Sequence, residues 1–274
     1  MLLLRQPIQT AGDDMNQKQD YIAVFDSGVG GISVLRHLRG LMPKERFLYF
    51  GDSANAPYGN RPTEEIRLLA LQAAEKLCGY GIKALVVACN TATAAAIDLL
   101  RSTYPELIVV GIEPALKLAA EKFPGGTVGV LATPVTLREE KFQKLVKTSS
   151  NHCQVINLPA SGLADLIESG KANSPESQEL LTPLLSPWAD KLDALVLGCT
   201  HYPFAAPTIS AILGDRVPLL DGGKGTAKET LRRLQAADLL WDGPGELRWE
   251  SSQNLTEMVH LYQSFLETED FANL

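Results

Sequence analysis

Two cysteines, Cys89 and Cys199, stand where a thiol can take part in chemistry. Each follows a run of Leu and Val, at 85–87 and 195–197, and each is followed by amide or hydroxyl side chains. An uninterrupted apolar run predicts a strand buried on both faces of a parallel sheet. Because ligands of open α/β sheets bind at the carboxyl ends of the strands, we expect both thiols at one ligand site.

A carboxylate and an imidazole accompany the two thiols. Asp26 ends an expected strand at 21–26, just before a glycine-rich turn, and His201 lies two residues after Cys199. Such groups can tune one thiol as an acid and the other as a base. Carboxylates at other expected strand or loop ends are Asp52 and Glu168.

The loops after the two cysteines also suit an anion. Asn90, Thr91 and Thr200 lie where helices are expected to begin, and helix N-termini bind carboxylates and favour a thiolate. The other two cysteines, Cys78 in an expected helix and Cys153 at the start of an expected strand, fit small core residues.

Other kinds of site stay open at this point. Cys89, Cys199 and His201 with a water would form the ligand set of a zinc hydrolase, although no closely spaced pair such as Cys-x-x-Cys is present. The segment 28–33 resembles a phosphate loop but lacks its Gly-Lys-Ser/Thr ending, which gives nucleotide binding little support. A two-lobed binding protein would explain the fold but not the paired thiols.

The sequence repeats its own organisation. An expected strand that ends in polar residues, at 21–28, precedes the strand that leads to Cys89. A similar strand, at 126–133, precedes the strand that leads to Cys199, and the number of residues between the two strands is nearly the same in both halves. This predicts an α/β protein of two pseudo-symmetric domains with mainly parallel sheets and an active site in the cleft between them. We expect residues 21–113 plus 222–274 in the first domain and 114–221 in the second.

Several elements follow from local signals. Residues 1–20 lack periodicity and are expected to be a disordered leader outside the fold, with Met15 as a candidate start. Helices are expected over 135–147 and 226–240, and a final helix is expected after Asn254.

The composition limits the classes of molecule that this chain is expected to bind. The chain has 274 residues and a formal net charge of -7, which argues against nucleic acid as a partner and leaves small molecules. No apolar run approaches the roughly 20 residues of a membrane span, and no signal peptide is recognisable. A cytoplasmic protein is expected, in which the four cysteines stay reduced.

Four blocks carry a family resemblance. They are FDSGVGG at 25–31, PYG at 57–59, ACNTA at 88–92 and GCTHYP at 198–203. They resemble the signature of the cofactor-independent aspartate/glutamate racemase superfamily, and within it the bacterial glutamate racemases. The resemblance implies interconversion of L- and D-glutamate, without cofactor or metal, to supply D-glutamate for peptidoglycan. Some members need a cell-wall precursor as activator, and a homodimer is open as the assembly.

The resemblance also implies roles for individual residues. Cys89 and Cys199 would be the catalytic acid/bases, assisted by Asp26 and His201. Substrate contacts would come from Asp26, Ser27, Tyr58, Gly59, Asn90, Thr91, Thr200 and His201. Auxiliary positions would be Asp52, Glu168, Thr133 and Thr136, although the segment 132–136 departs from the Gly-Thr-x-Gly-Thr pattern frequent in the family. An aspartate racemase or a decarboxylase would keep the scaffold, but the decarboxylase is expected to need one cysteine only.

Inversion at an α-carbon explains why two thiols would be required. One base must remove the α-proton and an acid must return a proton to the opposite face. With each sulfur at near-attack distance, we expect the two sulfurs about 7 Å apart, one as thiolate and one as thiol.

Overall fold

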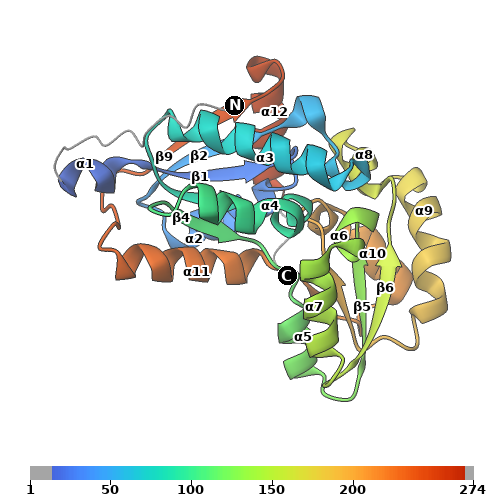
Figure 1. Ribbon diagram of the computed structural model, residues 1–274. Coiled ribbons are helices and arrows are strands. Elements are labelled where there is room, and N and C mark those ends of the chain that lie inside the picture. The colour runs from blue at the N-terminus through green and yellow to red at the C-terminus, as the bar shows by residue number, and fades with distance from the viewer. Residues whose placement is uncertain (1–13, 269–274) are drawn as a thin grey trace.

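The computed structural model describes residues 14–268, which form two lobes, each built on a parallel sheet (Figure 1). The first sheet has five strands in the order β4-β3-β1-β2-β9, and the second has four in the order β6-β5-β7-β8. Their bounds are β1 Tyr21–Asp26, β2 Arg46–Gly51, β3 Ile82–Val87, β4 Ile108–Gly111, β5 Thr127–Ala132, β6 Gln154–Pro159, β7 Ala194–Leu197, β8 Leu219–Leu220 and β9 Glu246–Ser251. We call the two halves the five-stranded lobe and the four-stranded lobe.

The two sheets share one topology. All neighbouring strands are parallel. The order β8-β7-β5-β6 in the second sheet matches β4-β3-β1-β2 in the first, so that β3 and β7, the strands before the two cysteines, are equivalent. The expected α/β architecture with two related halves is confirmed.

Helices cover both faces of the first sheet, as fully buried strands require. Along β1, Ile22 and Val24 belong to the core cluster that includes α2, whereas Ala23 and Phe25 belong to the cluster under α3 and α4. Figure 1 shows α3 and α11 on opposite sides of this sheet. The helices of this lobe are α1 Asp14–Gln19, α2 Ile32–Leu41, α3 Thr63–Cys78, α4 Asn90–Thr103, α11 Gly223–Ala236 and α12 Leu255–Glu267.

The second sheet is covered in the same manner. In the four-stranded lobe, α5 and α7 lie on one side of β5 and β6, and α9 and α10 lie on the other (Figure 1). The helices are α5 Leu116–Lys122, α6 Pro134–Arg138, α7 Glu140–Ser149, α8 Leu163–Glu168, α9 Pro175–Leu185 and α10 Ala206–Leu213. Single 3-10 turns lie at Ser53–Asn55, Tyr58–Asn60, Ser186–Trp188 and Tyr202–Ala205.

The chain crosses between the lobes twice, after β4 and after β8. The two crossing segments touch: a Cβ on Gly222 would lie 2.1 Å from the carbonyl oxygen of Glu113. Glycine at 222 is therefore required by the close approach of the two segments.

Two expected helices need correction, and one strand was not expected. The helix expected over 135–147 is interrupted at Glu139, whose extended backbone (φ -64°, ψ 139°) separates α6 from α7. The helix expected over 226–240 runs from Gly223 to Ala236. Strand β9 was not predicted, because an edge strand with several half-buried residues lacks the continuous apolar run used to find the others.

The expected leader also differs over its last residues. Residues 1–13 lie outside the described part of the chain, but 14–19 form helix α1. The carbonyl of Lys18 accepts a hydrogen bond from Lys83 Nζ at 2.7 Å, and that of Gln19 accepts one from Arg46 Nη1 at 2.6 Å. These contacts attach 14–20 to the first sheet. Over residues 14–268, no helix is both long and apolar enough to cross a bilayer.

Candidate active site

Cys89 lies between β3 and α4 and is the N-cap of that helix. Its sulfur accepts from the Ala92 N–H at 3.4 Å and donates to Ser27 Oγ at 3.6 Å. The side chain is buried. Burial and the nearby Asp26 carboxylate raise the pKa of the Cys89 thiol to about 12. Cys89 is therefore a protonated thiol in this arrangement, suited to giving a proton.

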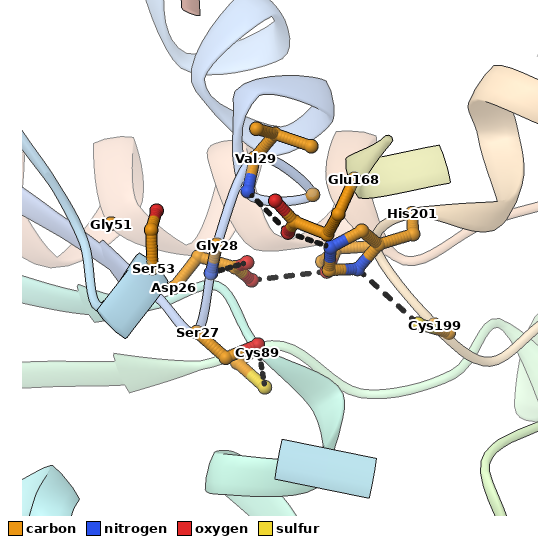
Figure 2. Close-up of polar contacts among 12 residues, drawn as sticks. Asp26, Ser27, Gly28, Val29, Gly51, Ser53, Cys89, Glu168, Cys199 and His201 are labelled. Atoms are coloured by element: carbon orange, nitrogen blue, oxygen red, sulfur yellow. Dashed lines mark hydrogen bonds and ion pairs between the residues drawn. The ribbon is translucent and has the colours of Figure 1, made fainter. Parts of the chain in front are cut away.

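Cys199 occupies the equivalent place after β7 but has different neighbours. Its sulfur lies 3.6 Å from His201 Nδ1, and His201 Nε2 lies 2.6 Å from Glu168 Oε1 (Figure 2). Burial alone lowers the pKa of His201, but contacts with Cys199 and Glu168 outweigh burial and raise it well above the ordinary value. A protonated imidazole beside Cys199 stabilises a thiolate there, so Cys199 is suited to taking a proton.

Asp26 and Glu168 connect the two lobes across the site. Asp26 accepts from the Gly28 N–H and from the Thr200 hydroxyl, both at 3.0 Å. Glu168 accepts from the Val29 N–H at 2.8 Å. Burial raises the pKa of Asp26, and the charge of His201 partly opposes this rise. Each carboxylate thus joins one wall of the site to the other.

Three threonine hydroxyls meet between the N-termini of α4 and α6. Thr91 Oγ1 lies 3.1 Å from Thr133 Oγ1 and 3.2 Å from Thr136 Oγ1, and the latter two are 2.9 Å apart. Next to Thr91, the side-chain oxygen of Asn90 is buried without a hydrogen-bond partner among the described residues. Hydroxyls and helix N-termini in this arrangement suit a carboxylate ligand.

The loop after β2 closes one side of the site. The Tyr58 hydroxyl donates to Asp52 Oδ2 at 2.6 Å, and Asn55 Nδ2 donates to both oxygens of the same carboxylate. Burial and Asp52 raise the pKa of Tyr58 above its usual value. A Cβ on Gly59 would lie 2.8 Å from Thr133 Cγ2, so glycine allows the loop to approach the other lobe. Asp52 therefore orients Tyr58.

The structure brings the sequence-predicted residues together at the carboxyl ends of the two sheets. Asp26 ends β1 and Ser27 follows it, Cys89 to Thr91 follow β3, Thr133 follows β5, and Cys199 to His201 follow β7. Almost all of them are buried. Asp52 lies behind Tyr58 and accepts the hydrogen bond from its hydroxyl.

Two contributors were missed from the sequence. The Val29 N–H is a backbone group, and no side-chain pattern marks its role. Ser33 donates from Oγ to the Thr200 carbonyl at 3.0 Å and joins the two cysteine-bearing lobes. Ser33 lies in the first turn of α2, close in sequence to Asp26, but its partner lies 167 positions away.

The zinc alternative finds no geometric support. Within the part of the chain that the structure describes, no group of three or more His, Cys, Asp or Glu side chains is placed to hold a metal ion. Cys89 and Cys199 instead have separate hydrogen-bond partners, Ser27 and His201.

Comparison with known proteins agrees with this geometry. Residues 32–230 match the family model described as Asp/Glu/hydantoin racemase. The chain belongs to this family. A glutamate racemase from Clostridium botulinum is 42% identical over 257 residues, which is 93% of this chain and 100% of the relative.

Solved racemase structures have the same fold. The glutamate racemase of Francisella tularensis, in complex with D-glutamate, superposes with a TM-score of 0.80 at 30% identity and covers 92% of this chain and 95% of its own. That of Escherichia coli, in complex with L-glutamate and the activator UDP-MurNAc-ala, superposes with a TM-score of 0.75 at 28% identity and covers 88% of this chain and 95% of its own. The two-lobed α/β fold of this chain is thus that of solved glutamate racemases.

Proposed function

We propose that this chain interconverts L- and D-glutamate without a cofactor, with Cys89 and Cys199 as the two acid/bases. The observation that carries the proposal is the pair of thiols at equivalent positions of two pseudo-symmetric sheets, one in each lobe. A single base serves one face of the α-carbon, whereas inversion needs a proton removed from one face and added to the other. Glutamate is favoured as substrate because the Clostridium botulinum relative, which this chain matches over 100% of its length, is a glutamate racemase.

The neighbours of the thiols support a direction for the first proton transfer. The Cys199 thiolate, stabilised by the protonated His201, takes the α-proton: the Cα–H bond breaks, an S–H bond forms, and the electron pair stays on the substrate. The Cys89 thiol then gives its proton to the opposite face and is left as a thiolate. The reverse reaction starts from that state with the roles exchanged.

The charge that develops on the substrate needs stabilisation near its carboxylate. We assign this role to backbone N–H groups at the start of α4 and to nearby polar side chains. The proposed substrate contacts are Asp26, Ser27, Tyr58, Gly59, Asn90, Thr91, Thr200 and His201, and the proposed auxiliary residues are Asp52, Glu168, Thr133 and Thr136. The unpartnered oxygen of Asn90 and the three meeting hydroxyls support this assignment.

The cellular role follows from the reaction. D-glutamate made by this chain would supply peptidoglycan synthesis. Two reduced thiols are needed for turnover, which supports the expectation of a cytoplasmic location. Because the Escherichia coli relative has been solved with UDP-MurNAc-ala as activator, activity should be assayed with and without such a precursor.

Proton NMR of L-glutamate in deuterated water, with chiral analysis of the product, tests the proposal. We expect deuterium at the α-position together with D-glutamate, with no cofactor added. Cys89→Ser and Cys199→Ser should each abolish racemisation while circular dichroism shows an unchanged fold. Undiminished racemisation by either variant would refute the two-thiol mechanism, and failure of the wild type with and without the precursor would redirect the search to aspartate.

A further inference from the structure

Tyr49 on β2 is a fully buried tyrosine whose hydroxyl reaches the turn behind the catalytic residues. It donates to the Gly28 carbonyl oxygen at 2.6 Å. Its ring packs edge-on against Trp249 and Tyr262, with centroids 5.5 and 5.1 Å away. Burial and the nearby Asp26 raise the pKa of Tyr49, so the hydroxyl keeps its proton and remains a donor.

The carbonyl that Tyr49 binds belongs to the same peptide unit as the Val29 N–H. A peptide unit is planar and trans, so its carbonyl and its N–H point in opposite directions and turn together. The Val29 N–H donates to Glu168 Oε1 at 2.8 Å, and Glu168 in turn contacts His201 (Figure 2). One hydrogen-bonded series therefore runs from the Tyr49 hydroxyl through this peptide to Glu168, His201 and Cys199.

The backbone around this peptide is shaped to receive Glu168. A Cβ on Gly28 would lie 1.7 Å from Glu168 Oε1, so only glycine leaves room for the carboxylate. The flexibility that glycine brings must be removed by other contacts if the N–H is to keep its direction. The Tyr49 hydroxyl supplies such a contact on the carbonyl side.

We infer that Tyr49 is a positioning residue for the Cys199 half of the reaction: it fixes the 28–29 peptide so that Val29 holds Glu168 against His201. This inference rests on the proposed function. Among the described residues, the hydrogen-bond partners of Cys89 are Ser27 and Ala92, and neither belongs to this series. Loss of the Tyr49 hydroxyl should therefore affect the two thiols unequally.

Tyr49→Phe tests the inference, with Tyr262→Phe as the matched control. Tyr262 is equally buried and belongs to the same ring cluster, but its hydroxyl contacts Ser53 and the Gly51 carbonyl. We expect the alkylation rate of Cys199 by iodoacetamide at neutral pH, followed by peptide mass spectrometry, to fall roughly three- to tenfold in Tyr49→Phe. The rate at Cys89 should not change, and Tyr262→Phe should leave both rates as in the wild type.

Kinetics supply a second readout. The equilibrium constant of racemisation is fixed by the solution, so kcat/KM must change equally in both directions, but the two kcat values need not. In Tyr49→Phe the ratio of the two kcat values should shift, and in a Glu168→Gln background Tyr49→Phe should have no further effect on Cys199 alkylation. Three results would overturn the inference. They are equal changes in the alkylation rates of Cys89 and Cys199 in Tyr49→Phe, no change in either rate, or an effect of Tyr49→Phe in the Glu168→Gln background as large as in the wild type. Alkylation needs no turnover, so it decides on Tyr49 even if glutamate proves to be the wrong substrate.

Discussion

Cys89 and Cys199 are equivalent by position but not by environment. Cys89 faces a serine hydroxyl and the Asp26 carboxylate, which opposes a thiolate, whereas Cys199 faces an imidazole that Glu168 helps to keep protonated. The pseudo-symmetry of the fold thus places two thiols at equivalent positions, and the side chains around them differ in charge: a carboxylate lies near Cys89 and an imidazole lies beside Cys199.

This asymmetry predicts an order of reaction with alkylating agents. With a pKa of about 12, the Cys89 thiolate is populated in roughly one molecule in ten thousand at pH 8, and this fraction grows tenfold with each pH unit. Iodoacetamide at pH 8 should therefore label Cys199 first, and labelling of Cys89 should increase steeply between pH 9 and pH 11. Mass spectrometry of digested samples measures both rates, and faster labelling of Cys89 at pH 8 would show that the assignment is reversed.

At this scale, the sequence predicted which residues gather at the strand ends better than it predicted their contacts. Cys89, Cys199, Asp26 and His201 were expected to lie close together because strand ends in a parallel sheet converge, and the structure brings them together. The link between Glu168 and Val29 was not predicted, because it joins a side chain of one lobe to a backbone group of the other. Sequence proximity contains no information about such a contact.

Helix α6 is short, but it contributes both to the site and to the packing of the two lobes. It begins at Thr133, the N-cap, and its residue Val135 is buried. Within the described chain, Val135 is the only residue of the four-stranded lobe in a core cluster that otherwise consists of five-stranded-lobe residues, Cys89 and Tyr58 among them. The Val135 side chain of the four-stranded lobe thus packs in the core of the five-stranded lobe. In the sequence, Val135 lies between Thr133 and Thr136.

Val135→Ala should therefore loosen the fit of the two lobes. We expect KM for glutamate to rise several-fold, because Thr133 and Thr136 are no longer held against Thr91. Val130→Ala on β5 is the control, since Val130 is equally apolar and fully buried but lies within the core of its own lobe. Both changes should reduce the free energy of unfolding by about 2 kcal/mol, but only the first should alter KM. Steady-state kinetics and thermal unfolding separate the two effects, and equal KM values would contradict this role of Val135.

The whole molecule is observed with its site closed. Cys89 is 5% exposed and Cys199 is 7% exposed, and inter-lobe hydrogen bonds from Val29, Thr91 and Thr200 surround them. A substrate can reach the thiols only if the lobes separate, and closure afterwards excludes water from the developing charge.

Glutamate should consequently protect both thiols from alkylation. Because the ligand stabilises the closed arrangement and fills the site, saturating glutamate should slow labelling of Cys89 and Cys199 at least tenfold at pH 9. Cys78, which is half-buried at the end of α3, is an internal control whose rate should not change. Equal labelling with and without glutamate would show that glutamate does not occupy the space beside the two thiols.

The double crossing of the chain between the lobes has a consequence for biosynthesis. The four-stranded lobe is inserted between β4 and α11, so it has left the ribosome in full while the five-stranded lobe still lacks α11, β9 and α12. During that interval β2 is an uncovered edge strand, a form of structure prone to pairing with other chains. The five-stranded lobe is therefore the last part of the enzyme to be completed, although most of its residues are translated first.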